Sequence, residues 1–199
     1  MAEPRPGRAW VVFALALLAA ALIGWGLPHE ALDWQPSLAW AQPWRSFTAV
    51  GVHYSALHLV ANSAGAMGVA ALGHSARLPL RCTLAWMAAW PLTQGGLLLQ
   101  PSLLHYGGLS GVLHAGVAIA GVHLVWRGAP RQRRIGAAIL AVLLLKLLSE
   151  TPWRGPLAHP AGWDIAVAPL AHASGVVAGV LCAVIAEALV RRPAKGLSA

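Results

Sequence analysis

The stretch GGLSGVLHAGVAIAGVHLVW, residues 107–126, joins a serine flanked by glycines to a long apolar run. The run begins at Ser110, contains no charged residue before Trp126 and is closed by Arg127. A helix that crosses a bilayer needs roughly 20 mostly apolar residues. We therefore predict a membrane-spanning helix over about residues 110–126, with Ser110 at its start.

The composition of the whole chain is that of a membrane protein. Of its 199 residues, 58% are hydrophobic and only 10% are charged, and the mean hydropathy is +0.63. A soluble domain of this size needs far more polar surface. The net charge of +8 comes from short clusters between apolar runs, which argues against a nucleic-acid partner. We expect one all-α membrane domain over residues 1–199, with the lipid bilayer as its surroundings.

Six apolar runs predict six transmembrane helices, at about residues 9–28, 48–72, 83–100, 110–126, 135–149 and 165–190. The first run is not a signal peptide, because the possible cleavage site Ala39-Trp40-Ala41 lies too far beyond it. Residues 28–50 form an outer loop whose mixed tryptophans and charges suit the headgroup layer. Residues 151–164 form a lid-like loop rich in proline and tryptophan.

The distribution of positive charge predicts the orientation of these helices. With both termini in the cytoplasm, the outer loops contain Arg45 and Arg154, and Lys146 falls within a span. Most of the 14 basic residues then lie on the inner side, as topology rules require. These inner residues are Arg5, Arg8, Arg77, Arg81, Arg127, Arg131, Arg133, Arg134, Arg191, Arg192 and Lys195.

Several polar residues interrupt the apolar runs near their outer ends. His53, His58 and Asn62 open the second helix, and Ser110 opens the fourth. His172 lies about 10 Å below the outer end of the sixth helix, at 1.5 Å per residue. Polar groups are costly in hydrocarbon unless they are paired or line a wet cavity. We expect these five residues to meet just beneath the outer surface.

The types of these residues indicate nucleophilic catalysis. Ser110 would lie at a helix N-terminus, where free N–H groups favour developing negative charge. A histidine within reach could accept its proton. Asp33 and Asp164 are the only aspartates and neither lies within a span. We therefore predict a dyad of Ser110 and His172, without an acid that orients the imidazole.

Two further patterns bear on this site. His58 and Asn62 are four residues apart and share a helix face, where they could stabilise an oxyanion or simply bond across helices. Gly175 and Gly179 form a face of small residues on the sixth helix. If the fourth helix packs there, His172 reaches Ser110.

Other chemistries fit less well. His29-Glu30 begins a zinc-protease motif, but no second histidine follows at the required spacing. A Ser–Lys mechanism could use Lys146, although Glu150 lies four residues further on and suits a local ion pair. His114 and His123 have no visible partner, and a path lined by histidines would favour a small transporter. We expect neither metal nor cofactor.

The motifs together resemble those of the rhomboid intramembrane proteases. They are Trp44-Arg45 in the outer loop, His53-x4-His58-x3-Asn62, Gly108-Leu109-Ser110-Gly111 and Ala171-His172-x2-Gly175-x3-Gly179. Their order and their placement on the predicted helices also agree. The resemblance covers about residues 44–179.

This resemblance implies that Ser110 is the nucleophile and His172 the general base. It implies an oxyanion hole formed by His58, Asn62 and the Ser110 backbone N–H, and cleavage in or beside a substrate's transmembrane helix. The small six-helix chain looks like the bacterial rhombosortase subgroup, whose substrates end in a glycine-rich sorting tail. That implies an inner-membrane protein with a site open to the periplasm. A catalytically inactive relative that binds transmembrane helices stays the alternative, and the oligomeric state is not predicted.

Overall fold

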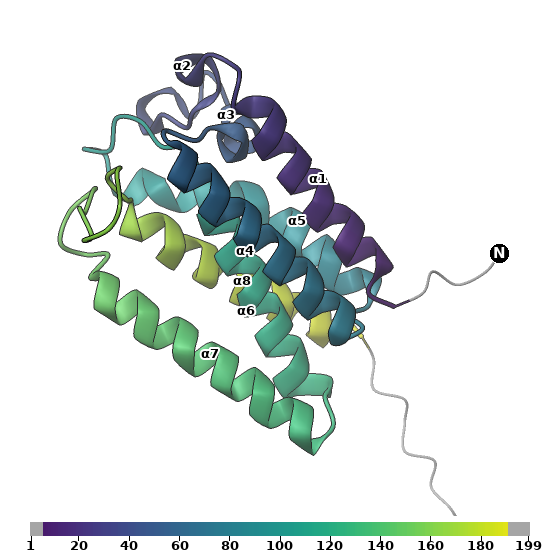
Figure 1. The fold of residues 1–199 in the computed structure, drawn as a ribbon. Coiled ribbons are helices and arrows are strands. Elements are labelled where there is room, and N and C mark those ends of the chain that lie inside the picture. Colours follow the sequence, from purple (N-terminus) through teal and green to yellow (C-terminus); the bar gives the residue numbers. More distant parts are fainter. Residues whose placement is uncertain (1–5, 191–199) are drawn as a thin grey trace, which may run out of the picture.

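The computed structural model describes residues 6–190, and within them six long helices form a bundle (Figure 1). Arg5, Arg191, Arg192 and Lys195, which were counted above as inner charges, lie outside the described residues. The long helices are α1 (Arg8–Gly24), α4 (Ala56–Ser75), α5 (Leu80–Gly95), α6 (Ser110–Arg127), α7 (Pro130–Glu150) and α8 (Pro169–Ala188).

Short elements fill the connection between α1 and α4. They are α2 (His29–Leu32), α3 (Arg45–Thr48) and 3-10 turns over Pro36–Leu38 and Ala49–Gly51. A further 3-10 turn, Gly96–Leu99, follows α5. Residues 6–190 contain no β-strand, so the all-α class is confirmed for the described chain.

Three helix starts differ from the prediction by four residues or more. α7 begins at Pro130 and not at residue 135, because a proline is well suited to the first position of a helix. α4 begins at Ala56 and not near residue 48, because the Ser55 side chain accepts a hydrogen bond from the His58 backbone N–H and caps the helix there. α8 begins at Pro169 and not at residue 165, because Val167 pairs its backbone with Ala158 across the preceding loop. The loop between α7 and α8 is therefore longer than expected.

α6 lies at the centre of the bundle and packs most closely on α8 (Figure 1). A Cβ added to Gly175 would lie 2.0 Å from the Gly111 carbonyl oxygen, and one added to Gly179 would lie 2.5 Å from that of Ala115. No real Cβ tolerates such distances. The two glycines thus let the backbones of α6 and α8 touch at the level of Ser110 and below.

Two tryptophans fill the centre of the bundle on the side of α1. Trp10 and Trp86 are fully buried and stack with their ring centroids 4.4 Å apart. Each ring N–H donates to a backbone carbonyl of another helix, Trp10 to Val69 at 2.8 Å and Trp86 to Val112 at 2.7 Å. These bonds satisfy the polar edge of each indole in an apolar core.

A buried carboxylate joins three helices at the end of the bundle away from Ser55. Glu187 of α8 is 1% exposed and pairs with Arg81 of α5, and with His123 and Arg127 of α6. A buried charge without partners would cost several kcal/mol. The expectation that His123 has no partner is therefore wrong.

By length and composition, two helices qualify as membrane spans, α4 and α8, and α1 is apolar but shorter. The other long helices carry polar groups that lower their hydropathy. α6 contains two histidines, and the first turns of α7 contain Arg131, Arg133 and Arg134. Of the six long helices, α4 and α8 thus meet the criteria for a membrane span.

The close packing of α6 on α8 leads to a prediction about the stability of the protein. Gly175→Ala places a methyl group against the Gly111 backbone, which cannot yield as a side chain would, and we expect a loss of about 3 kcal/mol. Thermal unfolding in detergent measures it. Gly68→Ala on α4 is the control, because a Cβ there meets nothing within 4 Å and alanine favours a helix. Equal melting temperatures for both variants would contradict the packing argument.

Candidate active site

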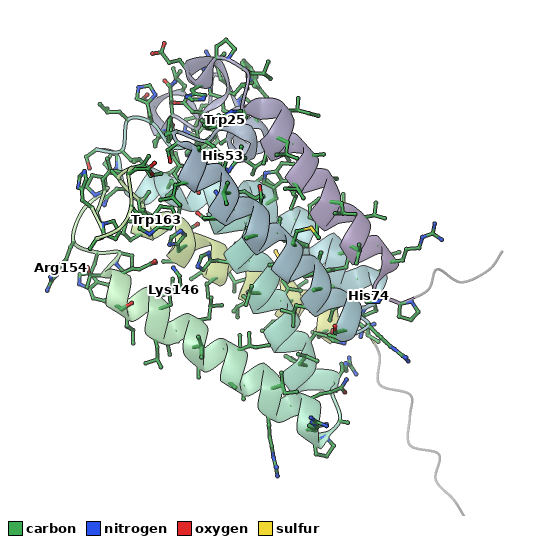
Figure 2. The ribbon with its side chains drawn as sticks, viewed as in Figure 1. Trp25, His53, His74, Lys146, Arg154 and Trp163 are labelled. Carbon is green, nitrogen blue, oxygen red and sulfur yellow. The ribbon has the colours of Figure 1, made fainter. Side chains whose placement is uncertain are left out.

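A cavity of about 940 Å³ opens at the end of the bundle where α4, α6 and α8 begin. Four of the predicted site residues line it, namely His58, Asn62, Ser110 and His172. In Figure 2 this end is marked by His53 and Trp163, and the opposite end of α4 by His74. The cavity continues along the apolar sides of α4, α6 and α7.

Ser110 and His172 meet at this cavity although they are 62 positions apart in the sequence. Ser110 is the first residue of α6, and His172 lies in the first turn of α8. The Ser110 Oγ lies 3.0 Å from the His172 Nε2. This is within hydrogen-bond reach, the geometry that a nucleophile and its base require.

A turn at Gly108, two residues before Ser110, lies against His58 and Asn62. Gly108 has a φ of +134°, which L side chains rarely adopt. A Cβ at Gly108 would lie 2.8 Å from the His58 ring and 3.7 Å from the Asn62 Nδ2. Glycine is therefore needed for two reasons, its conformation and the approach of the imidazole.

The same turn is held by contacts with the loop between α1 and α4. The Gly108 N–H donates to the Ala49 carbonyl at 2.9 Å, and Trp34 and Tyr106 exchange two backbone hydrogen bonds. The Tyr106 hydroxyl donates to the Gly108 carbonyl at 3.4 Å. Burial raises the pKa of Tyr106 to about 12, so this phenol stays a neutral donor.

His53 lies in the loop before α4 and supports Asn62 from behind. Its ring is fully buried, and burial lowers the pKa of His53. The neutral ring can accept a hydrogen bond at Nε2 from the Asn62 Nδ2, 3.0 Å away, while Nδ1 donates to the Gly51 carbonyl at 3.4 Å. The Asn62 amide is fixed in this way, with its second N–H left for the cavity.

The expectation that no acid reaches the imidazole is wrong. The Glu150 Oε2 lies 2.7 Å from the His172 Nδ1. Glu150 also forms the expected ion pair with Lys146, whose Nζ is 3.4 Å from the same His172 nitrogen. In Figure 2 the Lys146 side chain projects from α7 toward α8. Lys146 lies near the Nδ1 of His172, which is the ring nitrogen that faces away from Ser110. The group that meets the Ser110 hydroxyl is therefore the His172 imidazole and not the Lys146 amine.

His114 also contacts the site. Its ring stacks on that of His172, with centroids 4.3 Å apart and planes 16° apart, and its Nδ1 lies 2.7 Å from the Ser110 carbonyl oxygen. His114 is four residues after Ser110 and so shares its helix face. That spacing could have located His114 from the sequence alone.

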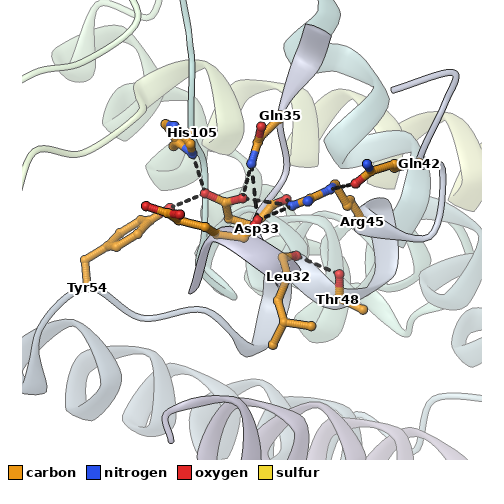
Figure 3. A network of polar contacts seen from close by, with 9 residues as sticks. Leu32, Asp33, Gln35, Gln42, Arg45, Thr48, Tyr54 and His105 are labelled. Carbon is orange, nitrogen blue, oxygen red and sulfur yellow. Dashed lines mark hydrogen bonds and ion pairs between the residues drawn. The ribbon is translucent and has the colours of Figure 1, made fainter. Parts of the chain in front are cut away.

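The Trp44-Arg45 motif lies outside the cavity and has two different environments. Trp44 is exposed, whereas the Arg45 guanidinium is buried and hydrogen-bonds to several groups of the loop between α1 and α4 (Figure 3). Its Nη1 donates to the Asp33 carboxylate at 3.1 Å and to the backbone carbonyls of Asp33 and Glu30 at 2.8 Å. Asp33 also accepts from the His105 Nδ1 at 2.7 Å, which joins this loop to the segment before Ser110.

The loop between α7 and α8 covers the cavity. The Ser55 hydroxyl donates to the Asp164 carboxylate at 2.7 Å, and the Trp163 ring lies 6.5 Å from the His58 ring. These two contacts hold the loop against the start of α4.

One cluster elsewhere has the residue types of a metal site. Cys82, His123 and Glu187 place a possible ligand atom each within 4.8 Å of one another. Arg81 and Arg127 already pair with the same carboxylate. Their two positive charges repel a cation, so the cluster fits an ion-pair centre better than a metal site.

A serine hydroxyl bonded to a histidine, beside further donors in a cavity, is the arrangement that nucleophilic acyl transfer requires. The family model of the Rhomboid domain matches residues 41–188, about three quarters of the chain. The chain belongs to the rhomboid family, whose members are generally intramembrane serine proteases, although some are inactive. Comparison with curated proteins finds no match.

The network in Figure 3 makes a prediction about folding. Asp33→Ala leaves the Arg45 guanidinium, 8% exposed, without its carboxylate, and we expect a loss of about 3–5 kcal/mol of stability. Chemical denaturation in mixed micelles measures it. Glu30→Ala is the matched control, because Arg45 bonds only to the backbone of Glu30. A loss as large at Glu30 would show that general loop charge, and not the buried pair, matters.

Proposed function

We propose that this protein is an intramembrane serine endopeptidase in which Ser110 is the nucleophile and His172 the general base. The observation that supports this most directly is the 3.0 Å separation of the Ser110 Oγ and the His172 Nε2. Membership of the rhomboid family supports this reaction class. Neither metal nor cofactor takes part in the proposed reaction.

The proposed chemistry proceeds in two acyl-transfer steps. The Ser110 Oγ attacks the carbonyl carbon of the scissile bond while its proton passes to the His172 Nε2. The tetrahedral intermediate then expels the amine, which receives that proton as the C–N bond breaks. Water, deprotonated by the same imidazole, hydrolyses the acyl-enzyme and restores the hydroxyl.

The oxyanion of each intermediate is proposed to bind His58, Asn62 and the Ser110 backbone N–H. The first two side chains lie beside Gly108, two residues before the nucleophile. The Ser110 N–H lies at the start of α6, where the helix dipole favours negative charge. Fixed donors of this kind stabilise charge that develops only in the transition state.

An apolar substrate suits the shape of the cavity. Below the polar groups its walls are formed by Gly65 and Leu72 of α4, Leu113 and Val117 of α6, and Leu143 of α7. A transmembrane segment that unwinds near its end could place its peptide bond at Ser110 while its apolar side chains stay in contact with these walls. The rhomboid family acts on transmembrane substrates, which agrees with this proposal.

We further propose that all six long helices cross the inner membrane of a bacterium as one domain. Both termini then lie in the cytoplasm, and the cavity opens to the periplasm, in accordance with the distribution of Lys and Arg. The six long helices of residues 6–190 are consistent with the rhombosortase subgroup, to which we propose that the chain belongs. Its substrates would be proteins with a C-terminal tail that is glycine-rich, then hydrophobic, then basic.

The proposed roles predict the effect of removing either side chain of the dyad. Ser110→Ala and His172→Ala should each abolish cleavage of a membrane-anchored reporter that ends in such a tail, and only wild type should react with a fluorophosphonate. Ser102→Ala and His74→Ala, at exposed positions, are the controls. Cleavage by either dyad variant at the wild-type rate would refute the mechanism. Labelling of Ser110 without cleavage of this reporter would refute the rhombosortase assignment alone.

A graded effect is expected at the oxyanion hole. Asn62→Ala should lower kcat by about 100-fold, because loss of one such donor typically costs about 3 kcal/mol. Cleavage of the same reporter in proteoliposomes measures it. An unchanged kcat in a folded variant would place Asn62 among the residues that only bond across helices.

The orientation makes a separate prediction. A fluorescent protein fused to the C-terminus should fluoresce in bacterial cells, because that end is proposed to lie in the cytoplasm. A periplasmic alkaline phosphatase fused at the same place should stay inactive. An active phosphatase with a dark fluorescent fusion would reverse the proposed topology.

A further inference from the structure

We infer that Glu150 is a positioning residue for His172, so that the site works as a Ser–His–Glu triad supplied by three helices. The inference rests on the proposed function, because it assigns a role relative to the same base. Ser110 comes from α6, His172 from α8 and Glu150 from the last position of α7.

The geometry determines which nitrogen of His172 holds the proton. A carboxylate can only accept, so the Glu150 Oε2 at 2.7 Å requires the proton on the His172 Nδ1. The Nε2 is then unprotonated and faces the Ser110 hydroxyl at 3.0 Å. This is the tautomer that a general base needs.

Because Lys146 lies nearby, the Glu150 carboxylate is needed to keep His172 in this tautomer. Its Nζ is 3.4 Å from the His172 Nδ1, and an ammonium can only donate. Without Glu150, Lys146 would be the nearest partner of Nδ1 and would favour the tautomer with the proton on Nε2. That tautomer cannot accept the proton of Ser110.

The i,i+4 ion pair with Lys146 favours α7, but two other features at Glu150 oppose the stability of this helix. A negative charge at the C-terminal end of a helix is opposed by the helix dipole. The next residue, Thr151, ends α7 at a φ of +48°, which is strained for a β-branched side chain. The unfavourable charge and the strained backbone both occur where the end of α7 meets His172 of α8.

The carboxylate also favours the charge that catalysis creates. When the Ser110 proton moves to Nε2, the imidazole becomes a cation, and Glu150 stabilises it without accepting the Nδ1 proton. His172 is 8% exposed and Glu150 24% exposed at the side chain, so water screens this pair only partly. This role of Glu150 adds no further chemical step to the proposed reaction.

The other groups around His172 do not replace this role. His114 of α6 stacks on the face of the ring and donates to the Ser110 carbonyl. Among residues 6–190, the Nδ1 of His172 meets only Glu150 and Lys146 within hydrogen-bond distance. The acceptor at this nitrogen is therefore the carboxylate.

The test is the rate of labelling by a fluorophosphonate in detergent micelles, separated into maximal rate (kinact) and half-saturation (KI). Glu150→Ala should lower kinact by about 100-fold with little change in KI. Formate, which can occupy the space of the lost carboxylate, should restore part of the rate. Glu150→Leu, which fills that space, should be as slow but should not respond to formate. Glu30→Ala removes an equal charge from an exposed position and should label normally.

The outcomes separate the two proposals. If Glu150→Ala is folded and its kinact is within twofold of wild type, Glu150 has no positioning role, while labelling of wild type still supports the protease. If formate accelerates Glu150→Ala and Glu150→Leu equally, the rescue is not local and the inference also fails. If Glu150→Ala does not fold, Glu150→Gln decides, with a tenfold or greater loss of kinact expected and an unchanged value contradicting the inference. If wild type is not labelled at all, the proposed function fails and this inference with it.

Discussion

The close approach of α6 and α8 determines where the Ser110 hydroxyl meets the His172 imidazole. Gly175 and Gly179 allow the two backbones to touch, and each first helical turn then presents one member of the pair to the same cavity. A bulkier residue at this contact would separate the helices, and a hydrogen bond of 3.0 Å does not survive a shift of an ångström or more. Packing between small residues is therefore the basis of the contact between Ser110 and His172.

The polar groups of the bundle divide into two sets with different physical roles. At one end, Glu187 forms ion pairs with Arg81, His123 and Arg127, and this cluster joins α5, α6 and α8. At the other end, the polar groups face a cavity and keep some capacity to bond a substrate. An apolar bundle can include both sets, because the groups of the first are paired with one another and those of the second face the cavity.

The sequence predicted the long helices and the meeting of Ser110 with His172, but not every partner of these side chains. Apolar runs and their spacing predicted all six long helices, and motif order brought Ser110 and His172 into one site. The start of α4 was misplaced because hydropathy does not register the cap at Ser55. The sequence paired Glu150 only with Lys146, because a spacing of four residues indicates a local ion pair on a helix. The contact between Glu150 and His172 could not be predicted in this way, because it depends on how the loop between α7 and α8 folds. His123 was left unpaired for the same reason, since Glu187 lies 64 residues away.

The most direct test of the central claim is an experimental structure of the protein after reaction with a small fluorophosphonate. We expect a covalent bond from the Ser110 Oγ to phosphorus, with the His172 imidazole within hydrogen-bond distance of that oxygen. We expect the phosphoryl oxygen to be directed toward His58 and Asn62. An unmodified Ser110, or an imidazole on another wall of the bundle and out of reach of the hydroxyl, would contradict it.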